Sequence, residues 1–563
     1  MTRQSFTGRA AAAGVALGLL HRPDRPPTVP RPRRPGTGPA AEVEDAFDAV
    51  AKHLAVLSDS LRSGGRTEQA DIMEVNSYLA QDPDLRASAA RRVAEGAAPA
   101  VAVQDAVSQY ADLIGALDDP ALAERATDIR QVGRRALAWL QGADLAAPAG
   151  PLVLLAHEIG AADLLEPGTE VVAAVSVTGG PNSHAAIVAR SLGIPLLLGL
   201  DPAVLELSDG AEAVVDAAGP HITVHPAPAE RALALAAMDA ARSRRVALAA
   251  ERHLPCETLD RYSVILRANI ATAEDAASAV RAGADGVGLM RTELPFLEAR
   301  SWPTEAEHAA ALTPALRLLA GRPVTVRTLD FADDKLPPFL TARADGSGVG
   351  RIGRGLPLML ARPDAFAAQF RAVLIAGAGT DLRIMIPMVA TVRELRACRE
   401  LLHAAAEDLG VPAPPIGAMI ELPEAVAIAD ELAREAAFLS IGSNDLTGQI
   451  LRLDRRDPAA TPALTAHPEV LRAVAQVVEA AHRHRRQVSV CGDAAAHPLV
   501  MPLLVGLGCD ILSAAPAVLD EIRARIRRLD SETCAMAARE ALAAGTVEEV
   551  WQIVEERCSP SLP

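Results

Sequence analysis

The second part of the sequence is a regular series of short, apolar, β-like runs separated by stretches of helical pattern. Eight such runs follow Cys256 over roughly 280 residues, which is the length and alternation of a (β/α)8 barrel. A doubly wound parallel sheet is the structural alternative. The runs are Val264–Ile270, Gly286–Met290, Val324–Leu329, Leu382–Met388, Ile416–Ile420, Phe438–Ile441, Gln487–Val490 and Cys509–Leu512.

Polar or charged side chains stand at the ends of six of these eight runs. In a barrel of parallel strands, catalytic groups lie where the strands end. A single arginine after a strand is usually a solvated loop residue, but six polar strand ends together indicate a functional site at this end, the barrel mouth. The residues concerned are Asn269, Arg291, Arg327, Glu421, Asn444 with Asp445, and Cys491.

The charged residues near the barrel mouth predict a particular ligand. Glu421 and Asp445 come from neighbouring strands and supply the hard anionic oxygens that suit Mg²⁺, which takes one or two protein carboxylates together with substrate oxygens. Arg291, Arg327 and Arg455 offer guanidinium groups that match phosphate and carboxylate in bidentate fashion. Together they predict a small, doubly anionic ligand that carries a phosphate and a carboxylate. The alternative is a ring of ion pairs around the mouth.

A second candidate centre lies between Thr178 and Arg190, where a strand-like run leads into a Gly-Gly turn. His184 falls in the first turn of a helix predicted over residues 183–191. Free backbone N–H groups and the helix dipole favour an anion there, such as a phosphoryl group on the imidazole. Imidazole is a competent covalent nucleophile. The alternative is a histidine that only caps the helix or is solvated.

The six cysteines lie far apart, without a CxxC pair or a zinc-binding spacing, and indicate reduced thiols in a cytoplasmic protein. Cys491 differs from the others because it stands among the charged residues of the mouth. It is either a buried structural cysteine or a proton donor, and the second role needs a thiol rather than a thiolate. The six are Cys256, Cys398, Cys491, Cys509, Cys534 and Cys558.

The chain ahead of the barrel has two further patterns. Ala-rich amphipathic windows predict a small helical bundle, and short β-like runs around one helix predict a compact α/β domain. The expected fold is therefore α/β, with a C-terminal (β/α)8 barrel preceded by a swivelling α/β domain into which a helical bundle is inserted. The predicted parts are 1–39 (strand and Pro/Arg loop), 40–145 (helical), 146–226 (α/β), 227–255 (linker helix) and 256–563 (barrel).

Composition and charge exclude several classes of protein. Half of the residues are hydrophobic but only 2% are aromatic, so the cores are built from Ala, Leu, Val and Ile, and a disordered chain is excluded. The formal net charge of −16 and the lack of a basic stripe argue against nucleic acid. No apolar run reaches the roughly 18 residues that span a bilayer. The stretch Ala10–Leu20 lacks the cleavage site of a secretory signal, so a cytoplasmic location is expected.

These motifs resemble enzyme I of the bacterial phosphotransferase system, the phosphoenolpyruvate (PEP)–protein phosphotransferase family, nearly from end to end. The segment Glu124–Arg135 looks like the subdomain that docks the phosphocarrier HPr, and no room remains for the ATP-binding region of a pyruvate phosphate dikinase. The blocks that carry the resemblance are GG-xx-SH-xx-I-x-AR around His184, GVGLMRTE (Gly286–Glu293), VRTLD (Val326–Asp330), RIMIPM (Arg383–Met388), IELP (Ile420–Pro423), SIGSNDLT (Ser440–Thr447), LDR (Leu453–Arg455) and VCGD (Val490–Asp493).

The resemblance implies a mechanism and partners. PEP would bind in the barrel mouth with Mg²⁺ on Glu421 and Asp445, and His184 would attack phosphorus in line. Cys491 would protonate the leaving enolate to give pyruvate. The phosphoryl group would then pass to a histidine of HPr, as the first step of sugar uptake, and the barrel would form a homodimer. The substrate-binding residues implied are Arg291, Arg327, Arg354, Asn444, Asp445 and Arg455.

The chain departs from the family pattern in several places, two of which are segments close to the expected phosphate site. Ala332–Lys335 replaces Gly-Gly-Asp-Lys and adds a carboxylate near an anionic ligand. In Gly348–Pro357, Arg354 is expected to keep a phosphate-binding role, but Pro357 cannot replace the family's second arginine. Three functions stay open at this point. They are an active enzyme with altered rate or partner choice, a regulatory paralogue that binds PEP or a phosphocarrier without efficient turnover, and a small-molecule PEP-dependent phosphotransferase.

Overall fold

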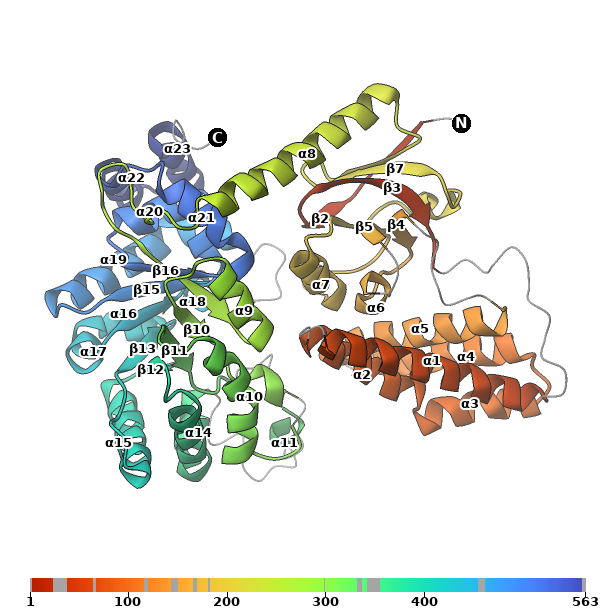
Figure 1. Cartoon of the computed structure of the whole chain (residues 1–563), viewed down its shortest axis with the longest axis horizontal. Helices are drawn as coiled ribbons and strands as arrows, with labels where there is room; N and C mark the ends of the chain where they lie inside the picture. The colour runs from red at the N-terminus through yellow and green to blue at the C-terminus, as the bar shows by residue number, and fades with distance from the viewer. Residues whose placement is uncertain are drawn as a thin grey trace. The chain divides into compact units, whose positions relative to one another are not determined.

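In a computed structural model, the chain folds into two compact units, Met1–Arg245 and Val246–Pro563 (Figure 1). Every helix in the described ranges is too short or too polar to span a bilayer. The structure describes residues 3–23, 38–63, 67–115, 120–142, 150–165, 170–180, 183–297, 299–331, 337–341, 355–453 and 461–558.

The helical pattern predicted for the first unit is confirmed as a bundle of long helices that pack side by side (Figure 1). Its core is mostly aliphatic and includes Phe47, Leu54, Met73 and Ile129, all fully buried. Asp82 ends one helix and starts the next, because its side chain accepts hydrogen bonds from two backbone N–H groups of the following turn. The helices are α1 (Pro39–Ser63), α2 (Thr67–Ala80), α3 (Pro83–Ala94), α4 (Pro99–Gly115) and α5 (Pro120–Leu140).

The remainder of the first unit is an eight-stranded mixed sheet in the order β1-β8-β7-β3-β4-β5-β6-β2. Strands β3, β4, β5 and β6 run parallel, and the outer strands pair antiparallel. The short helix α6 (Ala161–Leu164) follows β4, and the short helix α7 (His184–Leu192) lies between β5 and β6. The strands are β1 (Gln4–Thr7), β2 (Arg9–Ala12), β3 (Val15–His21), β4 (Pro151–Ala156), β5 (Glu170–Ser176), β6 (Leu196–Leu198), β7 (Glu212–Asp216) and β8 (His221–Val224), with a 3-10 turn η1 at Pro202–Glu206.

A buried carboxylate joins the bundle to the sheet. Asp163 on α6 is 9% exposed and accepts hydrogen bonds from the Nε2 of Gln131 at 3.3 Å and from the backbone N–H of Gly160 at 3.0 Å. Arg134 and Arg135 on α5 reach the same carboxylate at 3.2 and 3.5 Å. A Cβ built on Gly160 would lie 0.9 Å from the Nε2 of Gln131, so the glutamine occupies the space that a side chain at position 160 would need.

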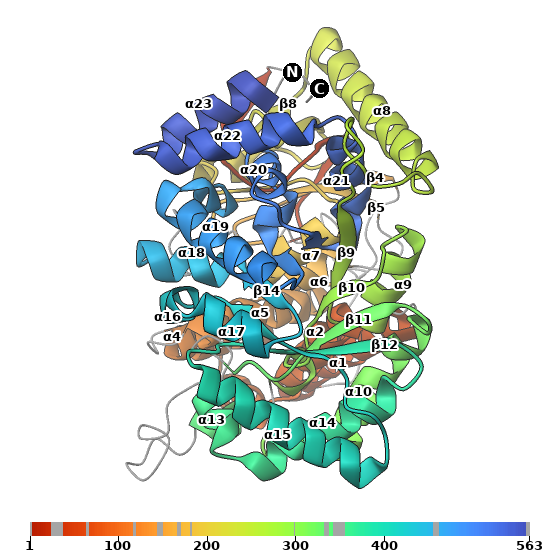
Figure 2. The same cartoon turned by 90° about the vertical axis from the view of Figure 1, so that its left-hand side faces the viewer.

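The second unit is a closed barrel of eight parallel strands, as the sequence predicts (Figure 2). Each expected strand is present, with bounds that differ by up to two residues. Helix α8 (Pro228–Ala250) corresponds to the predicted linker helix and ends just before the barrel. The strands are β9 (Ile265–Ile270), β10 (Val287–Met290), β11 (Pro323–Arg327), β12 (Asp381–Ile386), β13 (Ile416–Ile420), β14 (Leu439–Gly442), β15 (Val488–Cys491) and β16 (Ile511–Ala514).

Helices surround the barrel and cover the outward faces of its strands (Figure 2). The α-helices are α9 (Ala273–Arg281), α10 (Glu305–Leu318), α11 (Pro338–Thr341), α13 (Leu356–Leu360), α14 (Pro363–Ala376), α15 (Val392–Leu409), α16 (Pro423–Ala427), α17 (Ala429–Glu435), α18 (Ser443–Leu451), α19 (Pro468–Arg483), α20 (Met501–Gly506), α21 (Leu519–Ile526), α22 (Ser531–Ala543) and α23 (Val547–Cys558). Short 3-10 turns are η2 (Leu294–Phe296), η3 (Pro462–Ala466), η4 (Asp493–Ala496) and η5 (Pro516–Val518).

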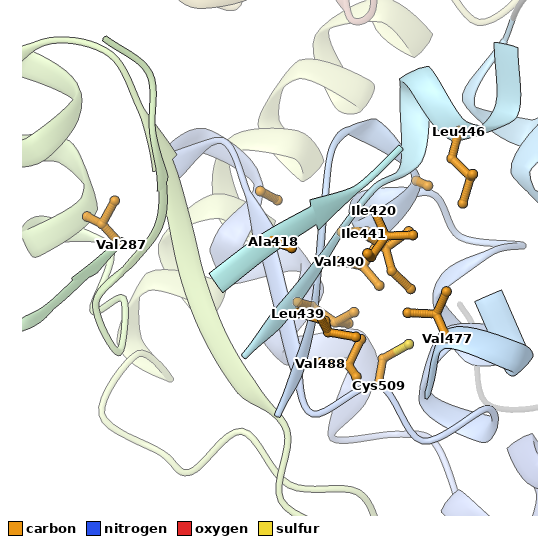
Figure 3. Close-up of a cluster of buried hydrophobic side chains, with 14 of the residues drawn as sticks. Val287, Ala418, Ile420, Leu439, Ile441, Leu446, Val477, Val488, Val490 and Cys509 are labelled. Atoms are coloured by element: carbon orange, nitrogen blue, oxygen red, sulfur yellow. The ribbon is translucent and has the colours of Figure 1, made fainter. Parts of the chain in front are cut away.

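The two faces of the barrel strands carry different side chains, since successive residues alternate. Outward residues such as Ile420, Ile441 and Val490 pack against the helices, with Leu446 of α18 and Val477 of α19 in the same cluster (Figure 3). Inside the barrel, a smaller apolar cluster is built from Leu289, Met385, Met419, Phe438 and Cys491.

A buried histidine stands apart from these apolar layers. His308 in α10 is 1% exposed, and its ring packs edge-on against Phe296 with the centroids 4.7 Å apart. Neither ring nitrogen has a hydrogen-bond partner within the described structure. Burial lowers the pKa of His308 to about 4, with the charge of Glu307 only partly opposing the shift. His308 is therefore a neutral imidazole in an apolar setting.

Candidate functional site

The predicted mouth residues gather at one end of the barrel, because parallel strands all end there. Arg327 is the last residue of β11 and Cys491 is the last residue of β15. Glu421 directly follows β13, and Arg291 directly follows β10. Asn444 and Asp445 lie in the first turn of α18, immediately after β14.

Arg327 is held between two buried carboxylates. Its Nη2 lies 2.7 Å from Glu293 and its Nη1 lies 3.0 Å from Asp330. All three residues are 5% exposed or less. Burial lowers the pKa of Arg327, but the negative charges of Glu293 and Asp330 outweigh that effect and leave its pKa raised. The guanidinium is therefore charged and fixed in direction before any ligand arrives.

A buried hydrogen-bond chain fixes the backbone around Arg327. Thr292 donates from its hydroxyl to the carbonyl oxygen of Arg327 at 2.9 Å, and Gln369 of α14 donates to the same hydroxyl at 3.1 Å. The amide oxygen of Gln369 accepts from the backbone N–H of Leu329 at 3.1 Å. Thus α14 ties the ends of β10 and β11 together and limits how far Arg327 can move.

Glu421 is a buried carboxylate that the main chain holds in place. Its Oε1 accepts a hydrogen bond from the backbone N–H of Met388 at 2.6 Å. Met388 has a φ of +53°, an unusual conformation for a non-glycine residue, and this turn aims its N–H at the carboxylate. A Cβ built on Gly442 would lie 2.9 Å from Oε2, so a side chain at position 442 would collide with this carboxylate.

The loop after β15 meets the start of α18. Asn444 donates to the carboxylate of Asp493 at 3.2 Å and accepts from the backbone N–H of the same residue at 3.3 Å. Gly492 has a φ of +115°, and a Cβ there would lie 2.4 Å from the hydroxyl oxygen of Ser443. Glycine is required at this close approach. The hydrogen bonds between Asn444 and Asp493 join the start of α18 to the loop after β15 at the mouth.

Cys491 is a buried thiol that faces the charged groups of the mouth. Burial raises its pKa, while a hydrogen bond from Ser440 (Oγ to Sγ 3.7 Å) lowers it in part. The positive charges of Arg327 and Arg291 lower it further, and the negative charge of Glu421 raises it. The thiol donates to the carbonyl oxygen of Ile441 at 3.5 Å. Cys491 is therefore protonated near neutral pH, as a proton donor must be.

Arg291 completes the described cations of the mouth. Its side chain is half-buried and, among the described residues, makes no hydrogen bond or ion pair. Arg354 and Arg455 lie outside the described residues, as do Ala332–Lys335. Pro357 is the second residue of α13, where its ring fits the first turn of a helix.

His184 lies in the first unit, at the first position of α7. Ser183 is the N-cap, and its hydroxyl accepts from the backbone N–H of Ala186 at 3.3 Å. Gly179, with a φ of +124°, turns the chain from the end of β5 toward this helix. The predicted strand–turn–helix around His184 is confirmed; the side chain of His184 lies outside the described part.

Sequence reasoning missed two residues of the site, Glu293 and Asp330. Both stand inside the quoted motifs, GVGLMRTE and VRTLD, two and three residues after the arginines that were singled out. The available signal was an acidic residue shortly after each strand end. Glu293 reaches Arg327 from the end of the neighbouring strand β10, and Asp330 reaches it from three residues along the chain, so the contacts depend on side-chain directions that the motifs do not state.

Three family models match the chain and together cover most of it. The PEP-binding domain of PEP-utilising enzymes matches residues 245–531, their N-terminal domain matches 7–125, and their mobile domain matches 149–219. The chain therefore belongs to the family of PEP-utilising enzymes.

Full-length relatives narrow the class to phosphotransferases and confirm the resemblance found in the sequence. A phosphoenolpyruvate–protein phosphotransferase of Bacillus sp. (strain S) is 32% identical over 99% of this chain and 98% of its own length. Multiphosphoryl transfer proteins of Xanthomonas campestris and Rhodobacter capsulatus are 36% and 35% identical, over 98% and 90% of this chain. The chain spans 67% and 62% of the length of those two larger proteins.

Proposed function

We propose that this chain transfers the phosphoryl group of PEP to its own His184 and then to a histidine of the phosphocarrier HPr, with release of pyruvate. In this role it catalyses the first step of sugar uptake by the phosphotransferase system. The observation that carries the proposal is the barrel mouth. There Arg327 with its partner Glu293, the carboxylate of Glu421 and the protonated thiol of Cys491 lie at the same end of the barrel. The match to PEP–protein phosphotransferases along the whole chain supports it.

Binding of PEP follows from the charges of the mouth. Arg327 is anchored on one side by Glu293 and Asp330, and a guanidinium has further N–H groups for a phosphate. Arg291 brings a second cation that is not engaged by the described residues. The amide of Asn444 and the guanidinium groups of Arg354 and Arg455 are proposed to complete the contacts to the phosphate and the carboxylate.

Glu421 and Asp445 fit a Mg²⁺ ion. They come from adjacent strands, and both stand at the carboxyl ends of those strands, where the mouth begins. Two protein carboxylates, with the remaining positions left to substrate oxygens and water, are the donor set that Mg²⁺ usually takes. When bound, the ion supplies positive charge that offsets the negative charge developing on the transferred group. Glu421 is held in direction for this role by its hydrogen bond from Met388.

Cys491 is proposed to give its proton to the enolate carbon when the phosphoryl group leaves. A thiol kept protonated by burial can donate this proton without a further acid, and loss of the proton leaves a thiolate near two arginines. The cations Arg291 and Arg327 lower the cost of that thiolate.

His184 is proposed to be the nucleophile that takes the phosphoryl group. It is the first residue of α7, and the backbone N–H groups and helix dipole at the start of a helix favour an anion. The bundle of α1 to α5 is the proposed docking site for HPr, and the barrel is the proposed homodimer interface. The cytoplasm is the proposed location, which the six free cysteines support.

The experiment that tests this function is incubation of the full chain with PEP labelled on phosphorus, with and without Mg²⁺, beside His184→Ala. The expected result is an acid-labile, base-stable label that needs Mg²⁺, is absent in the variant and appears together with pyruvate. Addition of purified HPr should then remove the label from the chain. Label that persists in the variant would overturn the role of His184. Binding of PEP without any label would instead support a regulatory protein.

A further inference from the structure

The lower end of the barrel interior, opposite the mouth, carries two arginines that no described residue neutralises at close range. Arg267 on β9 and Arg383 on β12 both point inward, since their strand neighbours Leu266, Ala268 and Ile384 belong to the outward cluster. We call Arg267, Arg383, Phe438 and Gln487 the barrel floor. Phe438 and Gln487 directly precede β14 and β15, which places them at the same end.

Arg267 is a buried cation without a partner in the described structure. Its side chain is 5% exposed, and its Nε is buried without a hydrogen-bond acceptor. No carboxylate of a described residue lies within ion-pair distance of it. Burial, reinforced by the positive charge of Arg383, lowers the pKa of Arg267 to about 10. An arginine in this setting needs an anion, because an isolated buried charge is strongly destabilising.

Arg383 is satisfied only in part. Its Nη1 donates to the Oε1 of Gln487 at 3.3 Å, and its guanidinium lies over the ring of Phe438 at 5.8 Å. Its Nε is also buried without an acceptor. The neutral amide of Gln487 and the ring orient this cation without cancelling its charge. The nearest acids, Asp285 and Asp381, are exposed at the rim, and one oxygen of Asp285 already accepts the backbone N–H of Leu266.

The barrel floor is separate from the PEP site. An apolar layer that includes Leu289, Met385 and Met419 fills the barrel between the two ends. In β12, Met385 pairs with Arg327, and Arg383 is the preceding inward residue, so the two sites lie on opposite sides of this layer. Phe438 fills the space over Gly417, where a Cβ would lie 2.5 Å from its ring.

We propose that the barrel floor binds a small tetrahedral oxyanion, phosphate in the cell, between the guanidinium groups of Arg267 and Arg383. Two cations match the charge of a phosphate dianion, and the Nη groups of Arg267, which no described residue accepts from, can donate to its oxygens. The amide nitrogen of Gln487 can add a neutral donor, because its oxygen already accepts from Arg383. The bound anion would stabilise the barrel, and it would not enter the phosphoryl transfer.

The test is titration of the full chain with inorganic phosphate at constant ionic strength, followed by calorimetry and by the thermal midpoint of unfolding. Two variants address the floor. Arg267→Met removes the buried cation, and Gln487→Glu keeps both arginines but adds a carboxylate beside Arg383. Arg322→Met is the matched control, since Arg322 also lies at this end of the barrel but donates to a backbone carbonyl. Arg291→Met removes a cation of the mouth, so a loss of phosphate binding in this variant would show that the phosphate binds in the mouth.

Saturable phosphate binding should weaken by about tenfold or more in both floor variants, because Arg267→Met removes a charge-assisted hydrogen bond and Gln487→Glu adds a carboxylate that repels the anion. It should persist in Arg322→Met and in Arg291→Met. Gln487→Glu should also raise the midpoint in phosphate-free buffer, because the added carboxylate supplies the missing negative charge. If Arg267→Met does not fold, Gln487→Glu decides alone. Unchanged phosphate binding in the floor variants, binding lost only in Arg291→Met, or no saturable binding at all would each overturn the proposal.

Discussion

The buried imidazole of His308 should make the barrel sensitive to mild acid. Its pKa of about 4 in the folded chain lies below the usual 6.5 of an exposed histidine. The folded state therefore favours the neutral ring. The contribution of the neutral ring to the free energy of unfolding is fully present above pH 6.5. It is lost as the pH falls toward 4, because the histidine of the unfolded chain takes up a proton at a higher pH than that of the folded chain.

The size of the effect follows from the two pKa values. At pH 5 the linkage relation gives a loss of about 2 kcal/mol in the free energy of unfolding, rising to about 3 kcal/mol below pH 4. The variant His308→Leu removes the titrating group and keeps an apolar side chain against Phe296. We expect its stability to fall less between pH 8 and pH 5 than that of the original chain, by about 2 kcal/mol.

Urea unfolding of the full chain measures this difference. Trp139 lies in the first unit, so the measurement uses a Trp139→Phe background, in which tryptophan fluorescence follows the barrel because Trp302 and Trp551 both lie in the second unit. The shift of the urea midpoint between pH 8 and pH 5, multiplied by the slope of the transition, gives the free-energy change. Exposed His403, replaced by Leu, serves as the control and should leave the pH dependence unchanged. If His308→Leu loses as much stability as the original chain, the imidazole is not the acid-sensitive group.

Three further outcomes follow from the site. Glu293→Ala should destabilise the barrel by about 3 kcal/mol in urea, since it removes one of the two carboxylates that neutralise the buried charge of Arg327, whereas the half-exposed Glu305→Ala should cost less than about 1 kcal/mol. Cys491→Ser should slow pyruvate formation by about a hundredfold with PEP affinity unchanged in calorimetry, and equal rates would exclude proton donation by the thiol. Chelation of divalent metal should stop labelling of the chain by PEP, and Mg²⁺ should restore it; labelling that continues in chelator would refute the metal site.

The barrel could be predicted because its strands differ sharply from what separates them. Each run is short, apolar and followed by a helical pattern, and all eight form strands. The ends of the strands were predicted less accurately than their existence. The run predicted over Val324–Leu329 is a strand over Pro323–Arg327, since the chain leaves the sheet at Arg327 to bring Asp330 back onto its side chain.

The sheet of the first unit was harder to predict. Pro151–Ala156 is buried on both faces, so it lacks the alternation that marks a half-buried strand. The stretch Ala10–Leu20, treated as one strand-like segment, is divided between β2 and β3. Gly14, with a φ of +133°, lies between the two strands.

Those parts of the candidate site that depend on the position of a single residue could be predicted from the sequence. Those that depend on a contact between two side chains could not. Polar residues at strand ends located Arg327, Glu421 and Cys491 directly. The clamp of Glu293 and Asp330 and the barrel floor depend on which side chains meet inside the barrel, and sequence spacing alone does not contain that information. Arg267 and Arg383, for example, come from strands that are not neighbours in the barrel.

The contact between Gly160 and Gln131 limits which chimeras between this chain and its relatives can fold. A side chain at position 160 would displace the amide of Gln131 from Asp163, and a different residue at 131 would leave a void over the glycine. The two positions are 29 apart in the chain, on the bundle and on the sheet domain, yet each constrains the other. A chimera that imports a foreign bundle should therefore fold well only when the turn between β4 and α6 is imported with it, so substitutions at these two positions should be inherited as a pair.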